Sequence, residues 1–207
     1  MKVVVSYINS LYDPKKTIEL INKTSADGIH ADLMDGIYVE NKNFDINTLS
    51  NYFESNQKPL DFHLMVNTPS VYFDTLFKLN PECIYIHLNT ETNIIDTLNK
   101  INSNNIAAGI VINPNEDLSL FDSIFPYVKR VLLMSVVPGK GGQKFIQDTK
   151  EKLINLKKYQ EKYNFEIYID GGINNETINE VSLADGVVSG SYICMSDNFE
   201  ERITSLK

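Results

Sequence analysis

Short apolar runs recur along the whole chain, and stretches with a helical period separate them. The runs are five to eight residues long and rich in Val, Ile and Leu, as expected of buried strands. They occupy residues 2–8, 28–34, 60–66, 83–89, 106–112, 130–137, 166–170 and 186–190. The pattern therefore predicts eight strands spread evenly over the chain.

Helical patterns fill the intervals between these runs. Pro occupies the first turn of residues 14–23 and 69–79, after Asp13 and Thr68, which is a signal for the start of a helix. Apolar residues recur at steps of three and four in residues 92–101 and 146–163. We also expect helices over residues 174–181 and 198–206, and weaker ones over residues 45–53 and 118–125.

Strands that alternate with helices across short connections indicate an α/β fold with a parallel sheet. Such a sheet can stay open and doubly wound, or close into a (β/α)8 TIM barrel. We favour the barrel, as a compact single catalytic domain over residues 1–207, which is the lower end of the usual length for this fold.

Composition narrows the classes of function. The net charge of -8 argues against binding to nucleic acid or to an anionic membrane surface. No apolar run approaches the ~20 residues of a membrane span. The two cysteines, Cys83 and Cys194, form no CxxC pair, which fits a reduced cytoplasmic protein. We therefore expect a cytoplasmic protein with a small-molecule partner.

Histidine and aspartate coincide on three of the predicted strands. His30 and Asp32 lie two residues apart and so point to one face, about 6.6 Å apart along the strand. Asp61 and His63 repeat this spacing, and a later strand ends on Asp170. Two imidazoles and two carboxylates suit Zn, Fe, Mn or Co. We expect one divalent metal ion, held by His30, Asp32, His63 and Asp170.

The third histidine is interpreted differently. His87 has no carboxylate two residues away, and a single histidine in a strand is usually a core residue. For the other set that interpretation is weaker, because burying ionisable groups on three strands without a function would be costly.

Glycines follow three consecutive strands in the second half of the chain. They allow backbone amides to face a ligand without obstruction by side chains. The residues concerned are Gly139, Gly141 and Gly142, then Gly171 and Gly172, then Gly190 with Ser191. In barrels the loops after the last two strands commonly bind phosphate. The first loop is not a Walker A loop, because Lys140 is followed by glycine. A phosphorylated small molecule is therefore favoured over a nucleotide.

These motifs together resemble the ribulose-phosphate 3-epimerase family over nearly the whole chain. The matching stretches are HADLMDG, DFHLM, MSVVPGKGGQKF and DGGI. The resemblance implies a metal-dependent enzyme that interconverts D-ribulose 5-phosphate and D-xylulose 5-phosphate through an ene-diolate. It implies that Asp32 and Asp170 are the catalytic acid-base pair, that the partner is a phosphorylated ketose, and that the protein is a homo-oligomer.

The resemblance also implies that Ser6 touches the substrate and that three methionines line the site. With the glycine loops, the expected substrate-binding set is Ser6, Met34, His63, Met65, Met134, Gly139, Lys140, Gly141, Gly142, Asp170, Gly171, Gly172, Gly190 and Ser191. Two positions depart from the family pattern: Glu40 replaces a proline, and Lys140 replaces an aromatic residue. Both bear on how the substrate fits.

Three alternatives stay open at this point. One is 3-epimerisation of another ketose phosphate, such as D-allulose 6-phosphate. A non-catalytic phosphosugar-binding barrel is less favoured, because it would lose metal ligands and all four are present. A sugar-phosphate decarboxylase needs a D-x-K-x-x-D pattern, and no lysine stands between Asp32 and Asp35. For Asp35 itself, both a role in fixing the loop and a simple turn are consistent with the sequence.

Overall fold

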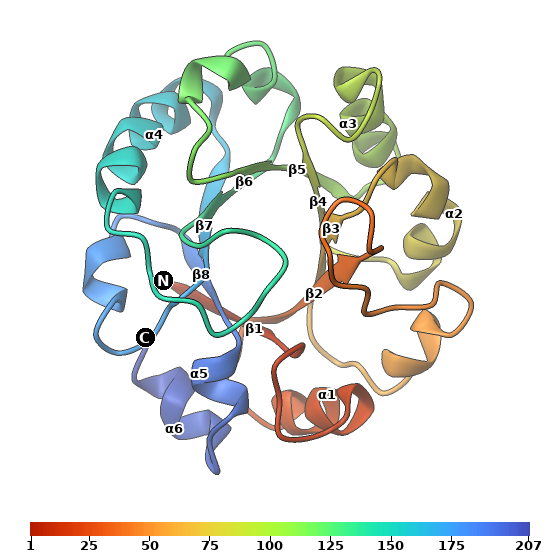
Figure 1. The fold of residues 1–207 in the computed structure, drawn as a ribbon, viewed down its shortest axis with the longest axis vertical. Helices are drawn as coiled ribbons and strands as arrows, with labels where there is room; N and C mark the ends of the chain where they lie inside the picture. Colours follow the sequence, from red (N-terminus) through yellow and green to blue (C-terminus); the bar gives the residue numbers. More distant parts are fainter.

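The computed structural model describes residues 1–207, and its strands close into one parallel barrel in chain order (Figure 1). The eight strands are β1 (Lys2–Ser6), β2 (Gly28–Met34), β3 (Leu60–Met65), β4 (Cys83–His87), β5 (Ala107–Ile112), β6 (Arg130–Met134), β7 (Glu166–Asp170) and β8 (Gly186–Ser189). β1 pairs with both β2 and β8, so the sheet has no free edge. The predicted barrel is confirmed, and the open sheet is excluded.

Four of the expected helices are present and pack outside the barrel. They are α1 (Pro14–Asn22), α3 (Ile94–Ser103), α4 (Thr149–Tyr163) and α6 (Phe199–Thr204). The Asp13 carboxylate caps α1 by accepting a hydrogen bond from the Lys16 backbone N–H at 3.0 Å. This cap satisfies one of the free amides at the start of a helix that begins with proline.

Other connections are built from shorter pieces than the sequence pattern suggested. Residues 69–79 form η2 (Pro69–Tyr72), α2 (Phe73–Leu76) and η3 (Phe77–Leu79). Residues 45–53 contain the 3₁₀ turn η1 (Leu49–Tyr52), and residues 118–127 contain η4 (Leu118–Phe121) and η5 (Phe125–Tyr127). A short helix that we did not predict, α5 (Ser191–Cys194), follows β8 directly.

The α-helix expected over residues 174–181 is wrong. Only the 3₁₀ turn η6 (Ile178–Val181) forms there. The Asn174 side chain accepts hydrogen bonds from the backbone N–H groups of Glu176 and Thr177, at 2.8 and 3.1 Å. Such local side-chain bonds offer the backbone an alternative to a helix, and here they hold the segment as a turn.

Two apolar cores lie on opposite sides of the barrel wall. The larger core lies between the strands and the outer helices and turns. The smaller core fills the lumen with inward-facing side chains, namely Val4, Cys83, Tyr85, Val111, Leu132, Met134, Val136, Tyr168 and Val188. The alternation of side chains along each strand explains how one short strand serves both cores.

Two tyrosines occupy the lumen because glycines on the neighbouring strands leave room for them. Tyr85 pairs in register with Gly109, and Tyr168 pairs with Gly186. A Cβ atom at either glycine would overlap the ring of its tyrosine. Each tyrosine is fully buried, so the two rings close the middle of the barrel.

An ion cluster lies where the strands begin. The guanidinium of Arg130 contacts carboxylates of Asp61, Glu82 and Glu166 at 3.1, 3.0 and 2.9 Å. It also lies over the Tyr168 ring, 5.0 Å from the centroid. Asp61 therefore points into the lumen, as its spacing from His63 predicts, but it belongs to this lower cluster.

No helix of the structure has the length and apolar character needed to cross a membrane.

Arg130→Met is expected to destabilise the fold strongly, because it leaves the Asp61 carboxylate buried without a cation. We expect the free energy of unfolding, measured by urea denaturation at pH 7, to fall by about 3–5 kcal/mol. Adding Asp61→Asn should recover part of the loss. The control is Lys16→Met, whose exposed pair with Glu19 should change stability by less than about 1 kcal/mol. A similarly small loss for Arg130→Met would refute the role of the cluster.

Candidate functional site

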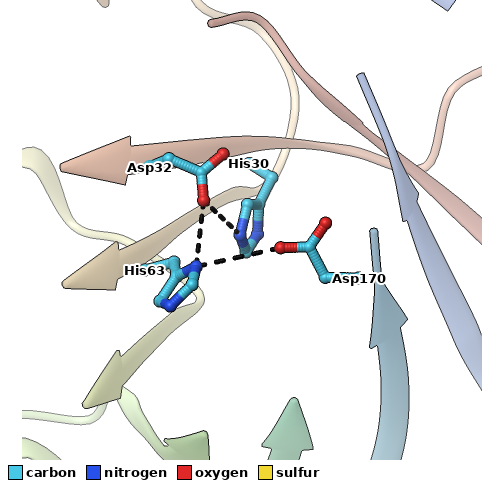
Figure 2. Close-up of side chains that lie close together, drawn as sticks. All are labelled: His30, Asp32, His63 and Asp170. Carbon is cyan, nitrogen blue, oxygen red and sulfur yellow. Dashed lines mark hydrogen bonds and ion pairs between the residues drawn. The ribbon is translucent and has the colours of Figure 1, made fainter. Parts of the chain in front are cut away.

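Four ionisable side chains meet inside the barrel at the C-terminal ends of the strands. His30 and Asp32 come from β2, His63 from β3 and Asp170 from β7 (Figure 2). Asp32 and His63 pair in register on adjacent strands, so their side chains leave the sheet side by side. Both histidines are fully buried, and Asp32 is 5% exposed. Alternate residues of a strand point to opposite faces of the sheet, so the positions of these polar residues in the apolar strands direct their side chains into the barrel.

The four side chains lie close enough to share one ion. The Asp32 Oδ1 atom lies 2.9 Å from His63 Nδ1 and 3.5 Å from His30 Nε2. The Asp170 Oδ2 atom lies 3.8 Å from His63 Nδ1. One ligand atom from each residue lies within 4.8 Å of all the others. The structure therefore brings together all four residues that the sequence pattern singled out.

Burial and close charges act against each other on the pKa values of this cluster. Burial lowers the pKa of His30, but the Asp32 carboxylate outweighs it and raises that pKa to about 9. Burial raises the pKa of Asp170, and the charge of Asp32 adds to this, giving about 7. Burial opposes ionisation of Asp32 as well, yet His30 and His63 lower its pKa well below the usual range. Asp32 is the ionised carboxylate, and Asp170 holds a proton more readily.

The residues present fit a divalent cation. The Nδ1 atom of His30 is buried without a polar partner, and its Nε2 atom has only the 3.5 Å contact with Asp32, which is costly for buried polar atoms unless they have another ligand. Two imidazoles and two carboxylates are a donor set for Zn, Fe, Mn or Co, and a dication would offset the repulsion between the carboxylates. The residues that would hold it are His30, Asp32, His63 and Asp170.

Two further buried side chains touch this set. The Ser6 hydroxyl donates to Asp32 Oδ2 at 2.7 Å and so fixes the carboxylate. The Nε2 atom of His87, at the end of β4, lies 2.9 Å from His63 Nε2. His87 is buried, as expected of a core residue, but the sequence reading missed this contact. The strand register held the signal, because His87 follows two residues after Tyr85, which pairs with His63.

A cavity of about 640 Å³ lies at this end of the barrel and has Asp32, His63 and Asp170 in its wall. His30 does not line it. The remaining residues of the predicted substrate-binding set all line this cavity: Ser6, Met34, Met65, Met134, Gly139, Lys140, Gly141, Gly142, Gly171, Gly172, Gly190 and Ser191. Lys144 lines it too, and the sequence reading did not single out this second cation of the loop after β6.

Part of the glycine pattern has a packing cause. Gly171 and Gly172 have φ values of +117° and +65°, which other residues rarely adopt. A Cβ atom at Gly171 would overlap Val136, and one at Gly172 would lie 2.6 Å from the backbone nitrogen of Phe145. These two glycines therefore let the loop after β6 pack against the end of β7, whatever else their amides bind.

The loop after β2 is fixed by Asp35. Its Oδ1 atom accepts hydrogen bonds from the backbone N–H groups of Ile37 and Tyr38, at 2.8 and 2.9 Å. Its Oδ2 atom accepts one from Asn67 N–H, at 2.7 Å, in the loop after β3. These amides outweigh the effect of burial and lower the pKa of Asp35. The open question about Asp35 resolves in favour of the loop-fixing role.

The two positions that depart from the family pattern face each other. Figure 1 shows the loops after β2 (orange) and β6 (teal) on the same face of the barrel. The Lys140 ammonium lies 3.7 Å from the Glu40 carboxylate, with both side chains mostly exposed. Next to this pair, the Asn41 amide donates to the Gly139 carbonyl at 2.6 Å. Residues 39–41 and 139–140 therefore connect the two loops at the rim of the cavity.

Several solved structures share this fold at low sequence identity. A 3-hexulose-6-phosphate synthase aligns over 100% of this chain and 98% of its own, with a TM-score of 0.69 and 17% identity. The tryptophan synthase α subunit of Campylobacter jejuni aligns over 100% and 95%, with a TM-score of 0.70 and 15% identity. At this level of identity the likeness concerns the barrel alone.

Sequence comparison is more specific. The chain is 39% identical to a ribulose-phosphate 3-epimerase of Helicobacter pylori (strain J99) over 91% of this chain and 89% of that protein. It is 36% identical to the one of Aquifex aeolicus, over 92% and 87%, and 30% identical to that of Bacillus subtilis, over 92% and 90%. The model of the ribulose-phosphate 3 epimerase family matches residues 6–194. The chain therefore belongs to the ribulose-phosphate 3 epimerase family.

Proposed function

We propose that this protein is a metal-dependent 3-epimerase that interconverts D-ribulose 5-phosphate and D-xylulose 5-phosphate. Family membership supports the class of reaction and the substrate. The observation that carries the mechanism is the placement of two carboxylates, Asp32 and Asp170, with two histidines at one end of a cavity with glycine-rich loops in its wall.

Inverting a carbon next to a ketone requires one group to remove its proton and another to return a proton on the opposite face. Asp32 and Asp170 come from β2 and β7 and approach the site from different directions (Figure 2). The ionised Asp32 suits the base, and Asp170, with a pKa near 7, suits the acid. The two exchange roles in the reverse direction.

The other residues hold these two groups in place. Ser6 fixes one oxygen of Asp32 by its hydrogen bond, and His63 lies against the other. Both carboxylates line the cavity, so the one that returns the proton can equilibrate with solvent between turnovers. A divalent cation held by the four residues would supply positive charge that stabilises the ene-diolate as it forms.

The phosphate would be bound at the rim, by the loops after β6, β7 and β8. Their glycines place backbone amides on the cavity without side chains in the way. Lys140 and Lys144 are the cations of this wall, in a protein whose net charge of -8 repels anions. A cavity of about 640 Å³ has room for a ketohexose phosphate as well, so both chain lengths belong in the assay.

Asp170→Asn should lower kcat for epimerisation by about 10²–10⁴-fold, because the amide can neither carry the proton nor pair with the cation. In deuterated water, the wild-type product should gain deuterium at the inverted carbon. Glu176→Gln is the matched control, because Glu176 lines the same cavity without contacting the four residues. An Asp170→Asn variant with more than a tenth of wild-type kcat, or a wild-type product without deuterium, would refute the pair of acid and base.

Removal of divalent metal should abolish epimerisation, and Mn, Co, Fe or Zn should restore it. The measurement is the rate after exhaustive chelation, with the metal content followed by elemental analysis. Circular dichroism must show that the chelated protein stays folded, so that lost activity reflects the site. Full activity in metal-free protein would contradict the proposed dependence on a divalent cation. The roles of Asp32 and Asp170 as acid and base would still be decided by the Asp170→Asn experiment.

The contribution of Lys140 to phosphate binding is best tested together with Glu40. Lys140→Gln should raise KM by roughly two- to five-fold with little change in kcat, since an exposed lysine acts on binding and not on the reacting bonds. Glu40→Gln should lower KM, because it frees the ammonium from its partner. Both effects should shrink in high salt. Unchanged KM in both variants would mean that Lys140 serves only the contact between the loops.

A further inference from the structure

One polar side chain of the cavity wall comes from the loop after β1 and has no part in the proposed reaction. It is Asn9, three residues beyond Ser6 at the end of β1, and it is half-buried. Figure 1 shows the loop after β6 (teal) reaching across the mouth of the barrel toward β1 (red). Asn9 contacts this loop at Gly141, so it joins two segments that are far apart in the chain.

The contact explains why residue 141 is glycine. Gly139 and Gly142 have φ values of +104° and +70°, which favour glycine, but Gly141 has no positive φ. A Cβ atom at Gly141 would instead overlap the Asn9 amide, and the amide nitrogen would be the atom nearest to it. The Asn9 amide therefore occupies the space that a side chain at residue 141 would take.

The loop after β6 has carbonyl groups that are bound and N–H groups that are free. The Gln143 amide donates to the carbonyls of Val137 and Lys140 at 2.6 and 2.7 Å, and a third carbonyl accepts the Asn41 amide. The N–H groups of residues 139–142 donate to no other residue. Successive free N–H groups of this kind favour an anion.

The Asn9 amide adds a donor to these N–H groups. Unlike the amides of Gln143 and Asn41, it forms no hydrogen bond with the loop that it contacts. An amide nitrogen carries two N–H donors and no acceptor. Donors that are packed together need a shared acceptor, and a phosphate group, with its charged oxygens, is the strongest one that the proposed substrate offers.

The main chain beside Asn9 is fixed by two helices. The Leu11 N–H donates to the Cys194 carbonyl, in α5, at 3.2 Å. The Thr17 hydroxyl, in α1, donates to the Ser10 hydroxyl oxygen at 2.8 Å. Asn9 therefore reaches the cavity from a held backbone, and little conformational freedom is lost when its amide binds a ligand.

We propose that Asn9 is a phosphate-binding residue, whose side-chain amide donates a hydrogen bond to the substrate phosphate beside the N–H groups of Gly141 and Gly142. This inference rests on the proposed function, because it takes the loop after β6 as part of the phosphate site. It adds a donor from the loop after β1 to the loops that follow β6, β7 and β8. Asn9 is neutral and directional, whereas Lys140 and Lys144 are exposed charges.

Two variants of similar shape separate the donor from the space that Asn9 fills. Asn9→Leu removes both N–H donors and should raise KM for D-ribulose 5-phosphate by about 10–100-fold, the range for one hydrogen bond to a charged group. Asn9→Asp replaces the donor with a negative charge and should raise KM further. In both variants kcat should change by less than about three-fold, because the phosphate does not react. The control is Asn115→Asp, which adds the same charge in the loop after β5, outside this cavity, and should leave KM unchanged.

Inorganic phosphate tests the contact without the sugar and without turnover. Its Kd, measured by ³¹P NMR titration, should rise in both Asn9 variants by about the same factor as KM, because the proposed contact involves the phosphate alone. An unchanged Kd together with a raised KM would mean that Asn9 acts on the sugar or on the loop, and would overturn the proposal.

The outcomes separate this inference from the function on which it rests. Wild-type protein without epimerase activity would overturn the proposed function, while the Kd of inorganic phosphate would still decide the role of Asn9. Active wild-type protein, with KM and Kd unchanged in Asn9→Leu and Asn9→Asp, would overturn the role of Asn9 alone. Circular dichroism checks that each variant is folded. If Asn9→Leu fails this check, Asn9→Ala removes the same donors, and its KM and Kd decide the question.

Discussion

The burial of carboxylates in a narrow apolar lumen is the constraint on which the structure depends. An ionised carboxylate taken out of water is unfavourable by several kcal/mol unless cations or donors surround it. Each inward aspartate is accordingly provided for: Asp61 by Arg130, and Asp32 by two histidines and a serine. Asp170 has the weakest partners, since its nearest contact in the set is His63 at 3.8 Å. It is the group whose pKa burial raises.

The lumen thus has two polar ends separated by an apolar middle. The lower end is a closed ion cluster around Arg130, fully satisfied by its three carboxylates. At the upper end, the Nδ1 atoms of His30 and His87 are buried without a polar partner. In barrels the C-terminal end carries chemistry and the N-terminal end carries stability. Here the difference is visible in the pairing of charges: the Arg130 guanidinium has a carboxylate on each side, whereas Asp170 and the histidines at the upper end are less fully paired.

The strands and the cluster of His30, Asp32, His63 and Asp170 could be predicted from sequence because both depend on local pattern. Apolar runs fix the strands, and a spacing of two residues fixes which side chains share a face. Closure of the barrel then brings β2, β3 and β7 together without further information. Contacts between segments that are distant in the chain could not be predicted from this local pattern. The pair Glu40 and Lys140 joins two loops about a hundred residues apart, and the contact of His87 needed the register between strands.

Some helix predictions were wrong for a different physical reason. In residues 174–181 the apolar spacing suits a helix, but Asn174 bonds to the nearby backbone and the segment forms a turn. The connections after β2, β3 and β5 are likewise 3₁₀ turns, or pieces of one turn, where the pattern suggested longer helices. Short helical segments gain little from their own propensity, so packing on the barrel decides their form.

The fit of Tyr85 against Gly109, and of Tyr168 against Gly186, has a consequence for how the sequence can change over time. Neither member of a pair can vary freely. A larger residue at the glycine meets the ring, and a smaller one at the tyrosine opens a void in the middle of the barrel. The pairs lie on neighbouring strands but are 24 and 18 positions apart in the chain. Among relatives, substitutions at the two positions of a pair should be correlated, so that a bulky residue on one strand is accompanied by a small residue on the next.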